Sequence, residues 1–466
     1  MKHSAFLFLY VVLLTTPLML KAQQPSVRVN ADHTVTLSLN VSKDVDDVVL
    51  KGSLATEIKR NNVINQVFRK QAKVSIDGDN GQYTYTTKSL PSDLYTYCFE
   101  VDDIDTLMPY AVKPTAEQLA ALRAKARTDT AGLGFVVPDS VRDGDTWYNW
   151  FVIPGGDGDN YLPQANVAHG KVEAVWYPSS IEGMSRRRMM VYTPPRYDGT
   201  HRYPVLYLLH GTGGDETSWL MLGRAAQILD NLISDHRCQP MIVVMTNENA
   251  DRAAAPGFDP YNTSLASSSA TPSMFGITES AFVKDIVGYV DSHYATLADK
   301  GHRAIAGVSL GGMHTLFITA NNPQTFGYVG LFSALINNEF SKPVHISKIN
   351  KAVNRIRSIG RYIPSVTTSK PGRSVTEISQ YANKGKLAVY DSLDVKLQRQ
   401  FATPPALYYI AIGINDPLLS QNDDYRTLLN GAHYKFTYHE SNGGHEWCNW
   451  RRYLVDFLPK LFKSNQ

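Results

Sequence analysis

Residues 306–314 read AGVSLGGMH, and this stretch decides the fold. An apolar run precedes it and a helix-like run follows it, with Gly307-x-Ser309-x-Gly311 between them. A sharp turn from a strand into a helix has this pattern, and it presents the serine hydroxyl at the N-terminus of the helix. Such a turn presses backbone segments together, so the flanking positions leave no space for a Cβ atom. A glycine-rich turn with no catalytic role can have the same sequence. The rest of the chain therefore has to distinguish a nucleophile turn from such a turn.

The sequence around this stretch alternates between apolar runs and helical spacing from about residue 166 to residue 466. The runs at 203–211 and 240–247 are continuously apolar, which is typical of strands buried on both faces of a parallel sheet. Helical spacing occurs at 224–236 and 279–294. Further strands are expected at 302–308, 328–334, 407–413 and 435–440. This alternation predicts an α/β domain.

The sequence before residue 166 has a different character. Residues 1–22 combine a charged start, an apolar run and a small residue at a cleavage point, which indicates a signal peptide and a secreted or periplasmic protein. Short alternating segments between Asp- and Gly-rich turns predict a small β-sandwich at 24–112. Residues 113–165 are interpreted as a linker and loop-rich segment.

The composition describes a folded protein with a sizeable core. Of the 466 residues, 43% are hydrophobic and 19% are charged, and the net charge is +3. The basic runs are too short to indicate nucleic-acid binding, and the Arg186–Arg188 cluster is interpreted as a solvated edge. Nothing after the N-terminus predicts a membrane span, and no metal or organic cofactor is expected. Cys98, Cys238 and Cys448 form no disulfide framework; one pair is possible, and three buried thiols are the simpler interpretation.

Three residues occur in the chain order that α/β-type serine hydrolases use, which is serine, then a carboxylate, then histidine. Ser309 is the candidate nucleophile. Asp416 follows the strand expected at 407–413, and His445 follows the strand expected at 435–440. A serine nucleophile needs a histidine base, and the histidine needs a carboxylate to orient it. The competing residues are Asp423, Asp424, His433 and His439.

Other polar residues near these positions have structural interpretations. Asp423 and Asp424 are interpreted as the N-cap and first turn of a helix. His439 lies inside a strand pattern, so its side chain belongs to one sheet face. His314 is expected to be a packed helix residue, and His210 is expected to support the loop that it begins.

The oxyanion formed by attack on a carbonyl group needs two N–H donors. The N–H of Leu310, directly after the serine, is the first candidate. The second is the N–H of Thr212 in the glycine-rich loop LLHGTGGDE. Three tryptophans, Trp219, Trp447 and Trp450, lie near these loops in the sequence and are interpreted either as core residues or as a surface for substrate.

Four segments together resemble carbohydrate esterase family one, which contains feruloyl and acetyl-xylan esterases and enterochelin-esterase-like proteins. The segments are YPVLYLLHGTGGDETSW, PMIVVMTN, HRAIAGVSLGG and ESNGGHEWCNWRRYL, and the resemblance covers about residues 165–463. It implies an α/β-hydrolase fold in which Ser309 is the nucleophile, His445 is the general base and then the acid, and Asp416 orients the histidine. The N-terminal sandwich resembles the immunoglobulin-like module often found before such esterases.

The chain departs from this family pattern at three places. Leu310 stands where many relatives have methionine, and Pro417 stands where relatives often have an aromatic residue. Residues 341–385 are long and basic and are interpreted as an insertion or a lid near the cleft.

The resemblance implies a secreted serine esterase that releases ferulate or acetate from plant polysaccharide or oligosaccharide. The alternatives are an enterochelin-type siderophore esterase, an acyltransferase and a non-catalytic carbohydrate-binding protein. The oligomeric state is not indicated. Tyrosines share strand faces in pairs, Tyr83 with Tyr85 and Tyr95 with Tyr97, and packing accounts for such pairs without a ligand. The sandwich is therefore expected to be a structural partner that helps to form one side of the active-site cleft.

Overall fold

The computed structural model describes residues 23–41, 47–62, 73–101, 104–106, 128–129, 134–135, 137, 140–144, 146–164, 166–261, 275–336 and 388–463. The predicted signal peptide at 1–22 and the predicted insertion or lid at 341–385 lie outside these residues.

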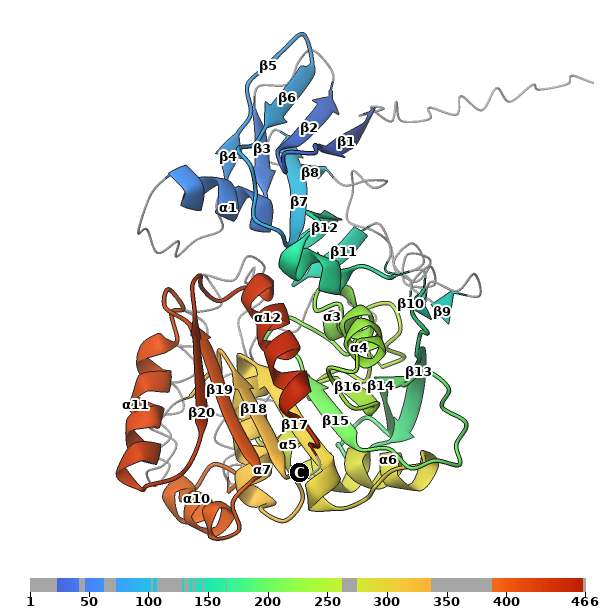
Figure 1. Cartoon of the computed structure of the whole chain (residues 1–466), viewed down its shortest axis with the longest axis vertical. Coiled ribbons are helices and arrows are strands. Elements are labelled where there is room, and N and C mark those ends of the chain that lie inside the picture. Colours follow the sequence, from blue (N-terminus) through green and yellow to red (C-terminus); the bar gives the residue numbers. More distant parts are fainter. Residues whose placement is uncertain are drawn as a thin grey trace, which may run out of the picture.

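The C-terminal part of the chain contains an eight-stranded sheet with helices on both faces (Figure 1). The strand order is β13-β14-β16-β15-β17-β18-β19-β20. The first two pairings are antiparallel and the others are parallel. The bounds are β13 (Lys171–Pro178), β14 (Arg186–Thr193), β15 (Val205–Leu209), β16 (Ile242–Thr246), β17 (Arg303–Val308), β18 (Tyr328–Phe332), β19 (Leu407–Gly413) and β20 (Thr437–Ser441). Each of the six predicted strands corresponds to one of β15 to β20.

The continuous apolar runs arise because helices cover both faces of this sheet. Leu206 and Leu208 of β15 pack in the core shared with α4 and α12, whereas Val205, Tyr207 and Leu209 pack in the core shared with α5 and α6. The helices are α3 (Ser218–Met221), α4 (Ala225–Ser234), α5 (Ile277–Phe282), α6 (Gly288–His293), α7 (Leu310–Asn321), α10 (Leu393–Ala402), α11 (Leu419–Gly431) and α12 (Trp447–Phe457). Within the described ranges, no helix is both long and apolar enough to cross a membrane.

The N-terminal part of the chain consists mainly of two antiparallel sheets that share one core. One sheet has the order β1-β2-β6-β5, and its strands are β1 (Gln23–Val29), β2 (Val35–Asn40), β5 (Gly78–Asp79) and β6 (Gln82–Thr86). The other has the order β11-β12-β7-β3-β4, with β8 also pairing with β7. Its strands are β3 (Val48–Lys51), β4 (Val74–Ser75), β7 (Leu94–Val101), β8 (Ile104–Thr106), β11 (Ser140–Asp143) and β12 (Thr146–Val152).

Two features of this sandwich differ from the sequence-based expectation. The segment 113–165 is more than a linker, because its strand β12 pairs with β7 and β11 extends the same sheet. The sandwich therefore continues beyond residue 112. A helix, α1 (Ser53–Asn62), lies between β3 and β4 where only strands were expected. Its residues Leu54, Ala55 and Ile58 pack into the sandwich core, so tertiary packing supports a short helix with weak intrinsic preference.

The paired tyrosines of the sandwich face its interior. Tyr95 and Tyr97 are buried in the core, and the Tyr95 ring stacks on Phe151 with centroids 5.6 Å apart. Tyr83 and Tyr85 are partly buried and pack against the same core. These side chains contribute to packing, which favours the structural interpretation of the sandwich.

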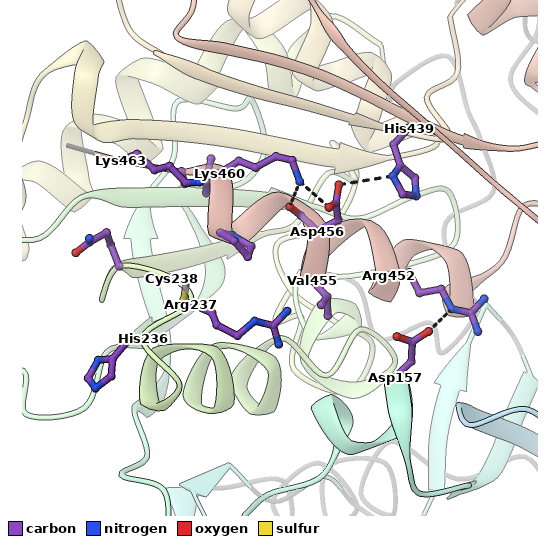
Figure 2. A pocket seen from close by; sticks show the side chains of 13 residues that line it. Asp157, His236, Arg237, Cys238, His439, Arg452, Val455, Asp456, Lys460 and Lys463 are labelled. Carbon is purple, nitrogen blue, oxygen red and sulfur yellow. Dashed lines mark hydrogen bonds and ion pairs between the residues drawn. The ribbon is translucent and has the colours of Figure 1, made fainter. Parts of the chain in front are cut away.

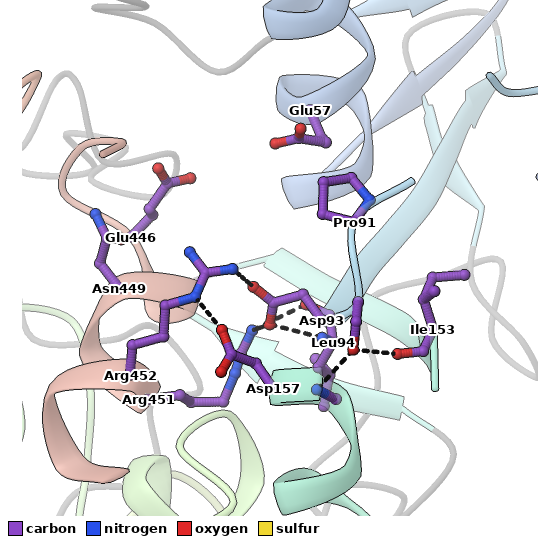
Figure 3. A network of polar contacts seen from close by, with 12 residues as sticks. Glu57, Pro91, Asp93, Leu94, Ile153, Asp157, Glu446, Asn449, Arg451 and Arg452 are labelled. Carbon is purple, nitrogen blue, oxygen red and sulfur yellow. Dashed lines mark hydrogen bonds and ion pairs between the residues drawn. The ribbon is translucent and has the colours of Figure 1, made fainter. Parts of the chain in front are cut away.

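The sandwich is joined to the C-terminal domain by ion pairs beside the predicted catalytic histidine (Figure 3). The carboxylate of Asp93, which directly precedes β7, lies 2.8 Å from Arg451 and 2.8 Å from Arg452, both on α12. From α1, the Arg60 guanidinium lies 2.6 Å from the carboxylate of Glu446. Because Glu446 lies between His445 and α12 in the chain, these contacts fix the loop that carries the histidine.

The cysteines are consistent with the simpler interpretation. All three are free thiols; Cys98 and Cys238 are buried and Cys448 is half-buried.

Candidate active site

Ser309 occupies a sharp turn between β17 and α7. Its backbone has φ 54° and ψ −115°, an unfavourable conformation for a residue with a side chain. The positions on either side of Ser309 have no room for a Cβ atom. A Cβ on Gly307 would lie 2.2 Å from the carbonyl oxygen of Gly311, and a Cβ on Gly311 would lie 2.5 Å from the carbonyl oxygen of His210. The Ser309 N–H donates to the carbonyl of Phe332 at 3.0 Å, which ties the turn to the end of β18. The strained turn is therefore held by its neighbours on both sides.

His445 and Asp416 form a hydrogen-bonded pair. Nδ1 of His445 lies 2.9 Å and 3.1 Å from the two carboxylate oxygens of Asp416, and both side chains are buried. The carboxylate also accepts the N–H of Leu418 at 2.8 Å, which fixes its orientation. With Nδ1 donating to the carboxylate, Nε2 of the neutral imidazole carries the lone pair. Nε2 has no hydrogen-bond partner among the described residues, so it is available as a base.

The loops that carry these two residues contact each other directly. The Asn415 N–H donates to the carbonyl of Gly443 at 2.9 Å, and a Cβ on Gly413 would lie 2.4 Å from that same oxygen. The loops follow the neighbouring parallel strands β19 and β20. Parallel strands end at the same edge of a sheet, and Ser309 follows β17 at that edge. This topology explains why three post-strand positions belong to one site.

The competing carboxylates, Asp423 and Asp424, lie on α11, which begins after Asp416. This helix begins at Leu419, so Asp423 and Asp424 lie within it and not at its start, contrary to the expectation. The reason is the turn at Asp416, whose carboxylate accepts a backbone N–H and starts the helix early. Asp423 instead forms an ion pair with Arg426 at 2.7 Å.

The other histidines have structural environments. His439 lies inside β20, as expected, and His433 is exposed after α11. Nε2 of buried His210 accepts the N–H of Glu248 at 2.8 Å, and Nδ1 of buried His314 lies 2.8 Å from the Glu248 carboxylate. His210 and His314 are therefore a loop support and a packed helix residue, as expected.

The glycine-rich loop after β15 passes directly beside Ser309. A Cβ on Gly211 would lie 3.2 Å from the Cβ of Ser309, and Thr212 is the next residue. The first backbone hydrogen bond of α7 runs from the N–H of Met313 to the carbonyl of Ser309 at 3.1 Å. The N–H of Leu310 precedes that ladder, as the first N–H groups of a helix do. The positions of both N–H groups are consistent with the predicted oxyanion donors, and their role stays a prediction.

The Arg186–Arg188 cluster is not a solvated edge, because Arg187 and Arg188 are buried. Arg187 donates to the carbonyl of Asn247 at 2.5 Å. Arg188 forms an ion pair with Glu216 at 2.6 Å, at the end of the glycine-rich loop. These guanidinium groups hold the loops after β16 and β15, a role that sequence composition does not reveal.

The three tryptophans form one aromatic cluster beside His445. Trp219 is 1% exposed and donates its indole N–H to the carbonyl of Leu209 at 3.1 Å, so it is a core residue, and this burial argues against the predicted substrate contact. The ring of Trp447 lies edge-on to Trp219 at 5.4 Å and to Trp450 at 5.0 Å. Trp450 lies edge-on to the imidazole of His445 at 5.0 Å. The cluster therefore supports the histidine from one side.

Sequence reasoning missed two residues of strand β11 that reach this site from the sandwich. The Arg142 guanidinium lies 3.4 Å from the carboxylate of Asp215, which belongs to the glycine-rich loop. Asp143 ends the same strand, and its carboxyl group lies near the side chain of Trp447. Burial raises the pKa of Asp143 to about 6, although the side chain of Trp447 and the charges of Arg142 and His445 act in the opposite direction. The Asp143-Gly144 dipeptide, typical of a hairpin turn, was the available signal.

A separate hollow of about 690 Å³ lies along the C-terminal end of α12 (Figure 2). It is lined by Arg237, Lys460 and other polar side chains, and none of the three candidate catalytic residues lines it. Figure 2 shows that two of its cations already pair with carboxylates, Lys460 with Asp456 and Arg452 with Asp157. We therefore assign the chemistry to the edge that carries Ser309.

The fold is that of an α/β-hydrolase, as predicted. The model of the family described as putative esterase matches residues 181–461, and the chain belongs to this family. The description of this family agrees with the predicted enzyme class, a carboxylic ester hydrolase. The immunoglobulin-like character of the sandwich stays a prediction.

Two relatives with endo-1,4-beta-xylanase in their names match parts of this chain. An endo-1,4-beta-xylanase/feruloyl esterase of Xylanibacter ruminicola is 36% identical over 192 residues, which are 40% of this chain and 25% of the relative. Endo-1,4-beta-xylanase Y of Acetivibrio thermocellus is 27% identical over 319 residues, which are 65% of this chain and 24% of the relative. The chain thus spans about a quarter of the length of these relatives.

Solved structures with similar folds include two esterases. A ferulic acid esterase of Anaeromyces mucronatus has a TM-score of 0.45 and 18% identity, covering 70% of this chain and 98% of that chain. The enterobactin esterase of Shigella flexneri has a TM-score of 0.49 and 15% identity, covering 94% of this chain and 96% of that chain.

Proposed function

We propose that this chain is a secreted serine esterase that releases ferulate or acetate from plant cell-wall polysaccharide. The observation that carries the proposal is the buried His445–Asp416 pair at the sheet edge where Ser309 occupies its strained turn. A family of esterases and a relative named as a feruloyl esterase support the reaction class. The predicted signal peptide fits a substrate found outside cells.

The geometry supports an acyl-enzyme mechanism. Ser309 Oγ attacks the ester carbonyl while Nε2 of His445 takes the hydroxyl proton. Asp416 holds the imidazole in the tautomer that leaves Nε2 free and stabilises the imidazolium. The N–H groups of Leu310 and Thr212 bind the oxyanion. His445 then protonates the leaving alcohol, and water, activated by the same histidine, releases the acid.

The first prediction tests the nucleophile. A fluorophosphonate probe, which reacts with activated serines, should label the wild-type protein on Ser309, located by peptide mass spectrometry. Ser309→Ala should lose the label completely. Labelling that persists in this variant would exclude Ser309 as the nucleophile.

The substrate class is tested by a panel of esters with the wild-type protein. Methyl ferulate, acetylated xylan and a catecholate trilactone represent the proposed substrates and the siderophore alternative. Release of ferulate or acetate with little trilactone cleavage is the expected result. Preferential cleavage of the trilactone would replace the proposed polysaccharide esterase with a siderophore esterase.

A further inference from the structure

The loop that carries His445 is held by the side chain of the residue that follows it. Glu446 is the N-cap of α12, but its carboxylate makes no capping hydrogen bond with that helix. The carboxylate turns back along the chain instead, and its Oε1 accepts the N–H of Gly444 at 2.9 Å. The side chain of Glu446 therefore connects the two residues that flank His445 in the sequence.

Further contacts restrict the backbone around His445. The carbonyl of Gly444 accepts the side-chain amide of Asn449 at 2.9 Å, and Figure 3 shows Asn449 beside Glu446 at the start of α12. A Cβ on Gly443 would lie 2.7 Å from Oε1 of Glu446, so the carboxylate packs closely against this turn. Both backbone polar groups of Gly444 thus have a partner at the start of α12, and the histidine follows directly.

The same carboxylate oxygen accepts a hydrogen bond from the sandwich. Nη2 of Arg60 lies 2.6 Å from Oε1 of Glu446. Nη1 of Arg60 lies 2.6 Å from the carboxylate of Glu57, which is one turn earlier on α1. The guanidinium is therefore held at both of its terminal nitrogens. Because apolar side chains of α1 pack in the sandwich core, a continuous series of contacts joins that core to the loop of His445.

Arg60 and Asp416 constrain different parts of the histidine. Asp416 contacts the imidazole at Nδ1, whereas Glu446 holds the backbone next to it. The side chain of Glu446 is 18% exposed, so without a partner its carboxylate can rotate toward water. A hydrogen bond between two charged groups is stronger than one between neutral groups, and the guanidinium of Arg60 therefore stabilises the orientation in which the carboxylate reaches Gly444.

We propose that Arg60 of the sandwich is a positioning residue for His445, which it holds in place through the carboxylate of Glu446. The inference rests on the proposed function, in which His445 takes the proton of Ser309, and adds to it a contribution from the other domain. Proton transfer requires the base within hydrogen-bond reach of the hydroxyl group. A displacement of about 1 Å reduces such a rate by about 100-fold, so Arg60 affects turnover without touching the substrate.

The test measures kcat and KM for methyl ferulate with the full chain. Arg60→Ala should lower kcat by about 10-fold to 100-fold. KM should stay nearly unchanged, because the substituted residue lies outside the substrate site and acts on the base. Arg60→Lys keeps the positive charge and should recover part of the lost turnover. The matched control is Lys59→Ala, which removes the neighbouring cation on α1 and should leave kcat unchanged.

A double-mutant cycle tests whether Arg60 acts through Glu446. Glu446→Ala should lower kcat at least as much as Arg60→Ala does. The double variant should be no slower than Glu446→Ala alone, because residues that act through one contact have non-additive effects. Free guanidinium at millimolar concentration, far below denaturing levels, should partly restore the kcat of Arg60→Ala and leave Glu446→Ala unaffected.

A purely structural role would lower the free energy of unfolding without changing kcat per folded molecule, so denaturant titration accompanies the kinetics. Wild-type kcat in the folded Arg60 and Glu446 variants would overturn the inference and leave the proposed function intact. The same conclusion would follow from losses that multiply in the double variant, or from a failure of both lysine and guanidinium to restore turnover. If the wild-type protein hydrolyses no ester, the proposed function fails and the inference fails with it.

Discussion

At the scale of single residues, Asp416 has two roles in the candidate site. Its carboxylate accepts hydrogen bonds from Nδ1–H of His445 and from the N–H of Leu418. A single carboxylate therefore orients the proposed base and starts α11. Its side chain is fully buried. A buried carboxylate with two donors has one stable orientation, and this orientation selects the imidazole tautomer.

Asp416→Asn should keep the fold and lose activity. The amide can donate to Nδ1 and favour the wrong tautomer, so kcat on methyl ferulate should fall by roughly 10⁴-fold, measured by ferulate release. Asp423→Asn is the control, because Asp423 lies on α11 and its half-exposed side chain pairs with Arg426. The assignment would be wrong if the Asp423 variant lost activity and the Asp416 variant kept it.

The pairing of Asp416 with His445 could be predicted from the sequence because parallel strands end at a common edge, where Ser309 also lies. The catalytic roles of the three residues stay a prediction. The sequence could not predict Arg142, because its ion pair with Asp215 depends on how the two domains dock. Nor could it separate a core tryptophan from a surface one, as Trp219 shows. These outcomes depend on contacts between residues far apart in the sequence, which no local pattern records.

At the scale of elements, the turn between β17 and α7 holds the proposed nucleophile. It works only because glycines let the nucleophile strand, the helix and the loop after β15 approach each other closely. Gly311 is the tightest contact with that loop, since a Cβ would lie 2.5 Å and 2.7 Å from two carbonyl oxygens of backbone that holds the oxyanion loop. Backbone atoms cannot move aside as a flexible side chain can.

Gly311→Ala should therefore lower stability and turnover together. Overpacking against backbone should reduce the free energy of unfolding by about 1–3 kcal/mol, measured by denaturant titration. A shift of the oxyanion donors should reduce kcat by roughly 10²-fold. Gly431→Ala, at the end of α11 with open space around its Cβ position, is the matched control and should change neither quantity appreciably. Full activity in the Gly311 variant would show that the loop is not fixed by this contact.

At the scale of the whole molecule, the sandwich and the hydrolase domain meet at one interface. α1, the start of β7 and the β11–β12 hairpin all reach the histidine loop, α12 or the glycine-rich loop. In Figure 1 the sandwich lies at the end of the sheet where α12 begins. This arrangement favours the prediction that the sandwich forms one side of the active site, because a module that only binds polysaccharide would need no contact with the histidine loop.

Asp93→Ala should test this arrangement, because Asp93 pairs with two arginines of α12. Arg451 is buried, so removing its partner leaves an uncompensated charge, and the free energy of unfolding should fall by about 3–5 kcal/mol. Since α12 follows His445 almost directly, turnover of methyl ferulate should also fall. Asp157→Ala removes a more exposed partner of Arg452 and should change stability by less than about 1 kcal/mol. If Asp93→Ala kept full turnover of methyl ferulate and lost only its binding to insoluble xylan in a pull-down, the sandwich would be a targeting module and not part of the active site.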